Sequence, residues 1–211
     1  MQQKEISKSV LKRLPVYLSY LKAQTDGPAN ISATALATAL NLGEVQVRKD
    51  LAMVSDGGRP KIGYNRIGLI DDIEQFLGYD NTNDAVIVGA GGLGGALRGY
   101  TGFAEYGLNI VAAFDVNPDL VGKVKSGKRI YPLEDLPQFC VEHKILMGII
   151  TVPAEHAQEV CNMLIDSGIL AIWNFAPVHL DVPADILVQN ENMATSLAVL
   201  SKHLSVQIGT L

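Results

Sequence analysis

The sequence predicts an α/β fold, in which a winged helix-turn-helix domain precedes a Rossmann domain and a C-terminal helix. Three observations predict it: two short helical patterns joined by a tight turn, apolar runs that alternate with helical patterns, and a glycine-rich motif after the first of these runs. The polar stretch from Tyr79 to Asn83 is the best domain boundary. We therefore expect domains over residues 1–80, 81–190 and 191–211.

The composition is that of a globular protein, with 48% hydrophobic and 18% charged residues in a chain of 211. No apolar run approaches the roughly 20 residues that a membrane-spanning helix needs, and the polar N-terminus lacks the apolar core of a signal peptide. Cys140 and Cys161 have no CxxC spacing, so we interpret them as core residues of helices rather than as a redox pair. We expect a cytoplasmic protein with no membrane partner.

Charge divides the chain more clearly than the net value of −5 suggests. Residues 1–70 hold ten Lys or Arg and five acids, a net charge of +5, whereas the remaining residues hold seven bases and seventeen acids, a net charge of −10. A basic module beside an acidic one favours a polyanionic partner for the first module. Chance also produces a charge of +5 in 70 residues, so charge alone does not decide the partner.

The N-terminal segment has the order of elements of a winged helix. Apolar residues recur at helical spacing over residues 9–24, and Ser32 is the expected N-cap of a short helix over residues 33–41. A tight turn with Gly separates this helix from a second one over residues 44–55. The Gly-rich stretch 56–65 that follows is typical of the tip of a β-hairpin, which would form the wing.

Basic and amide side chains lie where such a domain contacts double-stranded DNA. The second helix of a helix-turn-helix presents its N-terminal residues to base edges in the major groove, and Gln46, Arg48 and Lys49 occupy that part of the pattern. Arg pairs with guanine and Gln with adenine, whereas Lys49 is also suited to phosphate. Arg59 and Lys61 on the wing are suited to the minor groove or the backbone. The structural alternative is a small helical cap on an enzyme.

The rest of the chain alternates strands and helices, as a parallel doubly wound sheet requires. The expected strands are 85–89, 108–115, 145–152, 171–176 and 186–190. The expected helices are 93–107, 132–144, 153–168 and 192–208, and residues 116–131 are expected to form a loop.

A GxGxxG motif follows the first of these strands and opens a helix, which is the context that dinucleotide binding requires. Gly89 would make the tight turn, Gly91 would let the backbone approach a pyrophosphate, and Gly94 would allow close packing of helix on strand. The free N–H groups of the helix N-terminus would bind the phosphates. The intervening residues, which belong to the same predicted site, are Ala90, Gly92 and Leu93.

Asp115 ends the second strand, where a carboxylate accepts hydrogen bonds from the adenosine ribose. It also repels a 2′-phosphate, so we expect NAD(H) rather than NADP(H) as the ligand. Basic residues that follow slightly weaken this preference, although we favour their interpretation as a solvated loop: Lys123, Lys125, Lys128 and Arg129.

The sequence resembles the Rex family of redox-sensing transcriptional repressors over essentially its whole length. The motifs that carry the resemblance are KRLPVYLSYL (12–21), QVRKDL (46–51), GYN (63–65), VGAGGLGGAL (88–97), FDVNPDLVG (114–122), TVP (151–153) and NFAP (174–177). The resemblance implies a homodimer that binds operator DNA when NADH is low and leaves DNA when NADH binds. It also implies that the last helix is exchanged between the subunits.

The resemblance adds residues to both predicted sites. Val116 would join Asp115 at the adenosine, and Tyr100 would lie near the nicotinamide or the partner subunit. The residues that would line the cofactor cleft are Thr151, Val152 and Pro153, and Tyr64 of the GYN motif joins the predicted DNA-binding residues. The chain departs from many relatives in its wing, at Gly92 and at Asn192, which leaves the operator sequence and the discrimination between NADH and NAD+ open.

Two other functions remain possible from the residues alone. An NAD-dependent oxidoreductase needs a general acid or base, for which His156 is the only suitably placed histidine, but no substrate domain follows the Rossmann pattern. A CoA-binding module would share part of the C-terminal pattern without needing residues 1–70. We expect a sensor rather than an enzyme, with no catalytic residue and no metal. For the last helix, the alternative to exchange is that its leucines cover the sheet of their own subunit.

Overall fold

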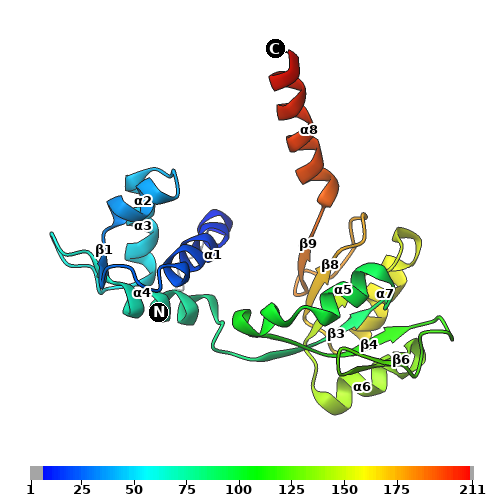
Figure 1. Ribbon diagram of the computed structural model, residues 1–211. Coiled ribbons are helices and arrows are strands. Elements are labelled where there is room, and N and C mark those ends of the chain that lie inside the picture. The colour runs from blue at the N-terminus through cyan, green and yellow to red at the C-terminus, as the bar shows by residue number, and fades with distance from the viewer. Residues whose placement is uncertain (1–6, 210–211) are drawn as a thin grey trace. The chain divides into compact units, whose positions relative to one another are not determined.

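The computed structural model describes residues 7–209, which divide into two compact units at Asn81 and Thr82 (Figure 1). Lys4 and Glu5, which entered the charge count, lie outside the described residues. Each unit has its own apolar core, so each is described separately.

Unit 1 is a small helical domain with a two-stranded sheet. Its described elements are α1 (Lys8–Ala23), β1 (Asn30–Ile31), α2 (Ala33–Ala39), α3 (Glu44–Val54), β2 (Tyr64–Asn65) and α4 (Arg66–Leu77). The predicted N-cap is confirmed, because the Ser32 side chain accepts a hydrogen bond from the Ala35 N–H. The core joins α1 to α3 and α4 through Leu14, Leu51 and Ile73, each of which is fully buried.

The predicted wing is present as a tight turn rather than a long hairpin. Arg59 and Gly63 exchange two backbone hydrogen bonds of 2.9 Å, and β2 then pairs antiparallel with β1. Gly63 has a φ of +84° and approaches the Ile31 backbone so closely that a Cβ would overlap it. This contact fixes the base of the wing.

Unit 2 contains a seven-stranded sheet within the described residues, in the order β5-β6-β4-β3-β7-β8-β9. All pairings are parallel except that of β5 with β6. The strands are β3 (Asn83–Val88), β4 (Leu108–Asp115), β5 (Val124–Lys125), β6 (Lys128–Pro132), β7 (Met147–Ile150), β8 (Ala171–Asn174) and β9 (Leu187–Asn190). The helices are α5 (Gly92–Gly99), η1 (Thr101–Tyr106), η2 (Leu133–Asp135), α6 (Leu136–His143), α7 (Ala154–Asp166) and α8 (Met193–Gly209).

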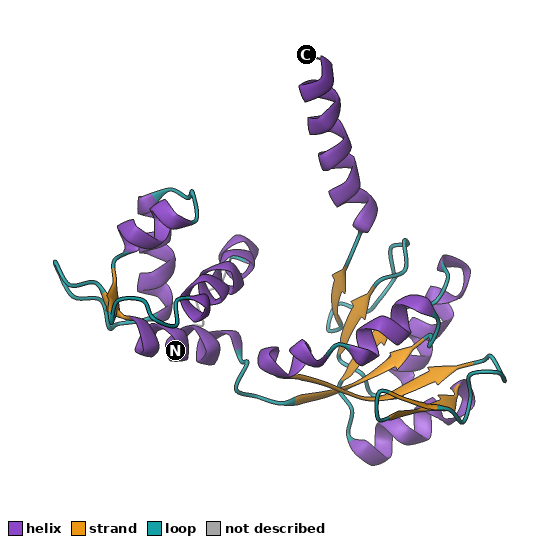
Figure 2. Ribbon diagram, in the orientation of Figure 1, coloured by secondary structure: helices purple, strands orange, loops and turns teal. Residues whose placement is uncertain are grey.

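Helices cover both faces of this sheet, as a doubly wound fold requires (Figure 2). Alternate residues of β3 point to opposite faces: Val86 and Val88 pack with α6 and α7, whereas Ala85 and Ile87 pack with α5 and η1. The predicted α/β class is therefore correct. The expectation that residues 116–131 form a loop is wrong, because this segment contains β5 and most of β6.

Helix α8 extends from β9 and buries none of its side chains in the described structure (Figure 1). Its leucines do not cover their own sheet: Leu197, Leu200 and Leu204 are between 52% and 65% exposed. The alternative in which α8 packs on its own subunit is thus not the arrangement of this structure.

Candidate functional site

The strand order of unit 2 defines where a ligand crevice must lie. Successive strands run outward from β3 through β4 and β6 on one side, and from β7 through β8 and β9 on the other. Ligands of such sheets bind outside the carboxyl ends of the strands at the point where the order reverses. Here that point lies between β3 and β7, and the residues that follow these two strands are Gly89 and Thr151.

Hydrogen bonds hold these two residues together. The Thr151 hydroxyl donates to the carbonyl oxygens of Val88 and Gly89, at 3.0 and 2.7 Å. Gly89 has a φ of +96°, and a Cβ there would lie 2.9 Å from the Thr151 backbone. The sequence therefore needs glycine at position 89 for two reasons, its backbone conformation and the close approach of Thr151.

The glycines of the loop differ in what surrounds them. A Cβ at Gly94 would overlap the Gly89 carbonyl oxygen, whereas a Cβ at Gly91 or Gly92 would meet nothing within 4 Å. Gly91 is also the N-cap of α5 and has no side chain to satisfy the first N–H groups of that helix. The open side of the loop thus presents free backbone donors and the positive end of a helix dipole, which together bind anions.

Asp115 lies beside this loop at the end of β4. Its Oδ2 accepts a hydrogen bond from the Ala90 N–H at 2.6 Å, and its Oδ1 accepts one from the Asn117 N–H at 2.8 Å. The carboxylate is therefore oriented by two backbone donors while remaining half-buried. Val116, the next residue, is 77% exposed at the rim.

The remaining residues of the predicted cofactor site lie in two places. Val152 and Pro153 follow Thr151 directly and lead into α7, and Leu93 is exposed on the first turn of α5. Tyr100 lies at the opposite end of α5, about 12 Å along the helix axis. Its ring is 55% exposed, so the structure does not bring it to the glycine loop of its own chain.

A pocket at the carboxyl ends of β8 and β9 was not predicted as part of the site. Its volume is about 220 Å³, and its lining residues are Ala176, Pro177, Val178, His179, Asn190, Glu191 and Asn192. Buried Asn174 shapes it by donating to the Asn190 side chain and to the carbonyl oxygens of Ala176 and Val178. Only the NFAP motif marked this segment in the sequence, because no charge or glycine pattern distinguishes it.

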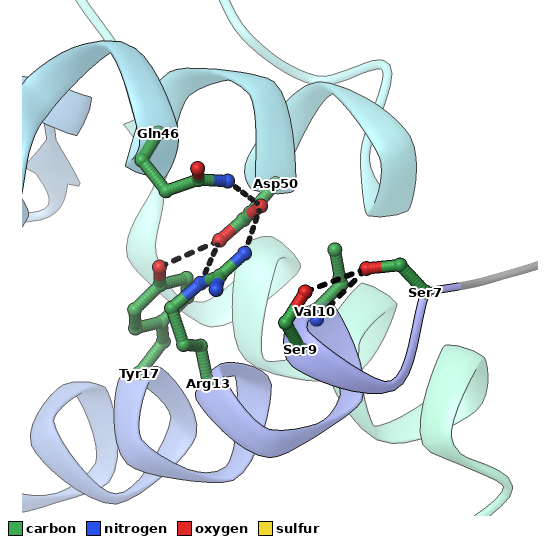
Figure 3. Close-up of polar contacts among 7 residues, drawn as sticks. All are labelled: Ser7, Ser9, Val10, Arg13, Tyr17, Gln46 and Asp50. Carbon is green, nitrogen blue, oxygen red and sulfur yellow. Dashed lines mark hydrogen bonds and ion pairs between the residues drawn. The ribbon is translucent and has the colours of Figure 1, made fainter.

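In unit 1, a buried carboxylate joins the first helix to the second helix of the helix-turn-helix (Figure 3). Asp50 on α3 accepts two hydrogen bonds from the Arg13 guanidinium, at 2.7 and 3.0 Å, and one from the Tyr17 hydroxyl at 2.8 Å. The Gln46 side-chain amide, one turn earlier on α3, donates to the same carboxylate at 2.8 Å. Gln46 is exposed but already paired, which the sequence did not predict.

Burial and hydrogen bonding oppose each other at this cluster. Desolvation alone would raise the pKa of Asp50, but the hydrogen bonds from Arg13, Tyr17 and Gln46 outweigh it and lower that pKa. Burial and the bond to Asp50 raise the pKa of Tyr17 to about 12. The cluster therefore contains an ionised carboxylate, a guanidinium and a neutral phenol at physiological pH.

The other residues predicted to contact DNA differ in exposure. Lys49, Arg59 and Lys61 are exposed, and Arg48 is exposed while pairing with Glu44 one turn earlier. Tyr64 is only 9% exposed and belongs to the core, where its ring lies beneath Gly58. The structure thus presents four cations on α3 and the wing, and uses Tyr64 for packing.

The two cysteines are free and buried in the core of unit 2, on α6 and α7. Burial raises the pKa of Cys140 to about 11 and also raises the pKa of Cys161. Their interpretation as core residues is confirmed. Residues 7–209 contain no helix with the length and apolarity that a bilayer crossing requires.

Models of two protein families match the two units. One is described as a putative DNA-binding protein N-terminus and matches residues 5–52, and the other is described as a CoA binding domain and matches residues 80–178. Among curated proteins, a redox-sensing transcriptional repressor Rex from Bacteroides thetaiotaomicron is 40% identical over 202 residues, which cover 95% of this chain and 92% of that protein. A Rex from Treponema denticola is 40% identical over 200 residues, covering 94% and 95%.

Solved structures of a Rex-family repressor, RSP, resemble the whole chain. The complex of RSP with β-NAD+ and operator DNA has a TM-score of 0.91 and 33% identity, covering 97% of this chain and 95% of RSP. The complex with β-NADH has a TM-score of 0.88 and 33% identity, with 97% of each chain covered. Both the dinucleotide and the operator are thus ligands of a protein similar to this one over nearly its full length.

Proposed function

We propose a function that proceeds from one premise: the chain belongs to the Rex family of redox-sensing transcriptional repressors. It binds operator DNA as a homodimer, binds NAD(H), and leaves the operator when NADH binds. The observation that carries the proposal is the likeness, over 97% of the chain, to a repressor solved both with β-NAD+ and operator DNA and with β-NADH. Because its partner is the operator, we also propose that it acts in the cytoplasm.

The dinucleotide would bind at the switch point of unit 2. The free N–H groups at Gly91 and Gly92 would hold the pyrophosphate, and Asp115 would accept hydrogen bonds from the adenosine ribose. The rest of the proposed cofactor site comprises Gly89, Ala90, Leu93, Gly94, Tyr100, Val116, Thr151, Val152 and Pro153. The pocket at Ala176–His179 adds a cavity at the same edge of the sheet, with both apolar and polar lining residues.

DNA would bind through the cations on α3 and the wing. We propose that Arg48 and Lys49 enter the major groove and that Arg59 and Lys61 contact the minor groove or the backbone. Gln46 would read a base only after exchanging its bond to Asp50. Tyr64 would support the wing from within the core.

Exposure of α8 supports a dimer in which this helix packs on the partner. Five of its exposed apolar side chains recur at helical spacing along one stripe, and Val199 and Val206 are exposed on the opposite face; the stripe comprises Met193, Leu197, Leu200, Leu204 and Ile208. An apolar stripe exposed to water is unfavourable unless another surface covers it. A two-fold dimer would also match the two half-sites of a palindromic operator.

An enzymatic function has less support. The relatives are named as transcriptional repressors, and a sensor needs only different affinities of its ligand for two states of the protein. The match to a CoA binding domain makes CoA the ligand against which NAD(H) has to be compared.

Fluorescence anisotropy on duplexes selected from a random-sequence library tests the proposal. We expect tight binding to the selected duplex without cofactor or with NAD+, and release when NADH is added, while CoA has no effect. A Gly91→Arg variant should bind the same duplex but no longer respond to NADH. Equal affinity for the duplex in all cofactor states would refute the redox switch, and absence of any selected duplex would refute DNA binding.

A further inference from the structure

An arginine with two unpaired nitrogen atoms is buried in the last turn of α5, the helix whose N-terminus would hold the pyrophosphate. Arg98 lies on α5, is 2% exposed, and is among the largest fully buried side chains of the described residues. Its Nε and Nη1 atoms are inaccessible to solvent and have no hydrogen-bond partner within residues 7–209. Transfer of a charge from water into such surroundings is costly unless a partner compensates it.

No carboxylate among residues 7–209 forms an ion pair with Arg98, and the charged group that interacts with it is a second cation. The Lys128 ammonium, on β6, donates a hydrogen bond to the Arg98 carbonyl oxygen at 3.3 Å. Burial and then the Arg98 charge lower the pKa of Lys128, and burial lowers the pKa of Arg98 itself. Two cations thus lie close together at the C-terminal end of α5.

The position of Arg98 on α5 relates it to the glycine loop. Arg98 is four residues after Gly94, so both lie on the face of α5 that packs on the sheet. Long side chains in a helix lean toward its N-terminus, which here is the end that carries the free N–H groups. The core cluster on the face of the sheet that α5 covers is apolar, so a charge buried on that face is weakly screened.

We propose that Arg98 is an affinity-determining residue for the dinucleotide: its buried charge adds to the dipole of α5 and strengthens binding of the pyrophosphate without touching it. This inference rests on the proposed function, because it takes the pyrophosphate to lie at the N-terminus of α5. It explains why the chain keeps a charge at a position where an apolar side chain would pack at lower cost. Stability is reduced at this position in favour of ligand binding.

Calorimetric titration of the full-length protein with NADH, ADP-ribose and adenosine tests the inference. Replacement Arg98→Met keeps the side-chain volume and removes the charge, so we expect about tenfold weaker binding of NADH and ADP-ribose. Binding of adenosine, which lacks phosphates, should change less than twofold. Thermal unfolding of the ligand-free variant should occur at the same or a higher temperature than that of the unmodified protein.

Two further variants separate charge from packing. Arg98→Lys keeps the charge and should retain affinity for ADP-ribose within about threefold. Lys125→Met removes an exposed cation of the same unit. Any loss of affinity for ADP-ribose in this variant should vanish at high salt, because salt screens surface charges more than buried ones. The loss of affinity in Arg98→Met should persist at high salt.

The possible outcomes are distinct. Equal loss of affinity for adenosine and ADP-ribose, with a lower unfolding temperature, would assign Arg98 a structural role and overturn the inference. Unchanged affinity of Arg98→Met for ADP-ribose would overturn it as well, while leaving the proposed function intact. An unmodified protein that binds neither NADH nor ADP-ribose would overturn both.

Discussion

At the scale of single residues, Asp50 concentrates the polar interactions of unit 1 in one carboxylate. Arg13 and Tyr17 donate to it from α1, and Gln46 donates to it from α3, so its hydrogen bonds connect the two helices. The sequence did not predict this role, because Asp50 stands among exposed polar residues of the QVRKDL motif and only the packing of α1 on α3 reveals its burial. The same contact pairs Gln46, which the sequence predicted to contact a base.

Replacement Asp50→Ala should lower the free energy of unfolding by about 3 kcal/mol, because it leaves the Arg13 guanidinium and the buried Tyr17 hydroxyl without their acceptor. Urea denaturation followed by circular dichroism measures the loss. Asp56→Ala, at an exposed position on the adjacent turn, is the matched control and should change stability by less than about 0.5 kcal/mol. Equal losses in the two variants would contradict the role assigned to Asp50.

The same carboxylate makes stability depend on pH in a defined direction. Its pKa is lower in the folded protein than in the unfolded chain, where a carboxyl titrates near about 3.9. The stabilisation is therefore complete above the unfolded-state pKa and is lost as the pH falls through the folded-state pKa. The difference in unfolding free energy between the unmodified protein and Asp50→Asn should stay constant from pH 7 to about pH 5 and shrink below pH 4. A difference that grows on acidification would refute this assignment.

Two glycines of the loop should respond differently to the same substitution. Gly94→Ala places a methyl group against the Gly89 carbonyl, so it should displace the loop and lower the unfolding temperature. Gly91→Ala meets open space and should unfold at the unmodified temperature, yet bind NADH more weakly, because its methyl group occupies the side that the pyrophosphate approaches. Scanning calorimetry and NADH titration of both variants test this; equal thermal stabilities would contradict it.

At the scale of elements, the sequence predicts the bounds of a helix or strand best where its apolar pattern is long or where a capping residue marks the start of a helix. Strand β4 matches its predicted range of 108–115, and Ser32 caps α2 as expected. Strand β6 escaped prediction because KRIYP begins with two charged residues and is too short to show a period. Its place beside β4 is determined by backbone pairing of Ala113 with Ile130, which no local pattern records.

The residues of the candidate site also differ in how far the sequence predicts their contacts. Spacing alone predicted Gly89, Gly94 and Asp115, whose close contacts the structure then describes. The hydrogen bonds of Thr151 could not be predicted from residue types, because they depend on two strands that are adjacent only after folding. The burial of Arg98 could not be predicted either, because arginines on short helices are usually exposed and only the packing of α5 on the sheet buries this one.

The apolar stripe of α8 carries a prediction about assembly. The double replacement Leu197→Glu with Leu204→Glu puts two charges in the middle of the stripe, so we expect sedimentation velocity to shift from dimer to monomer. The matched control is Thr195→Glu with Ser205→Glu, which adds the same two negative charges at exposed polar positions outside the stripe. That variant should remain dimeric. A stripe variant that stays dimeric would show that α8 does not form the interface.

At the scale of the whole molecule, the basic excess belongs to a part of unit 1 rather than to the whole unit. Residues 1–70 carry a net charge of +5, but residues 71–81 add four acids and no base, so unit 1 carries +1 and unit 2 carries −6. Unit 2 therefore repels a polyanion, whereas attraction to unit 1 depends on the part that precedes the acids of α4. Communication between the two ligands must then pass through the protein, as a difference in affinity between two of its states.

Such communication is reciprocal by thermodynamic necessity. If NADH weakens operator binding by a given factor, the operator must weaken NADH binding by the same factor, which for typical couplings is about 5- to 150-fold. Anisotropy gives the first factor from duplex titrations with and without saturating NADH, and calorimetry gives the second from NADH titrations with and without duplex. NAD+ in the same cycle should yield a smaller factor in both directions, because the proposed switch responds to the reduced form. Factors of one in both directions would contradict the proposed switch, whereas unequal factors would mean that one of the titrations had not reached equilibrium.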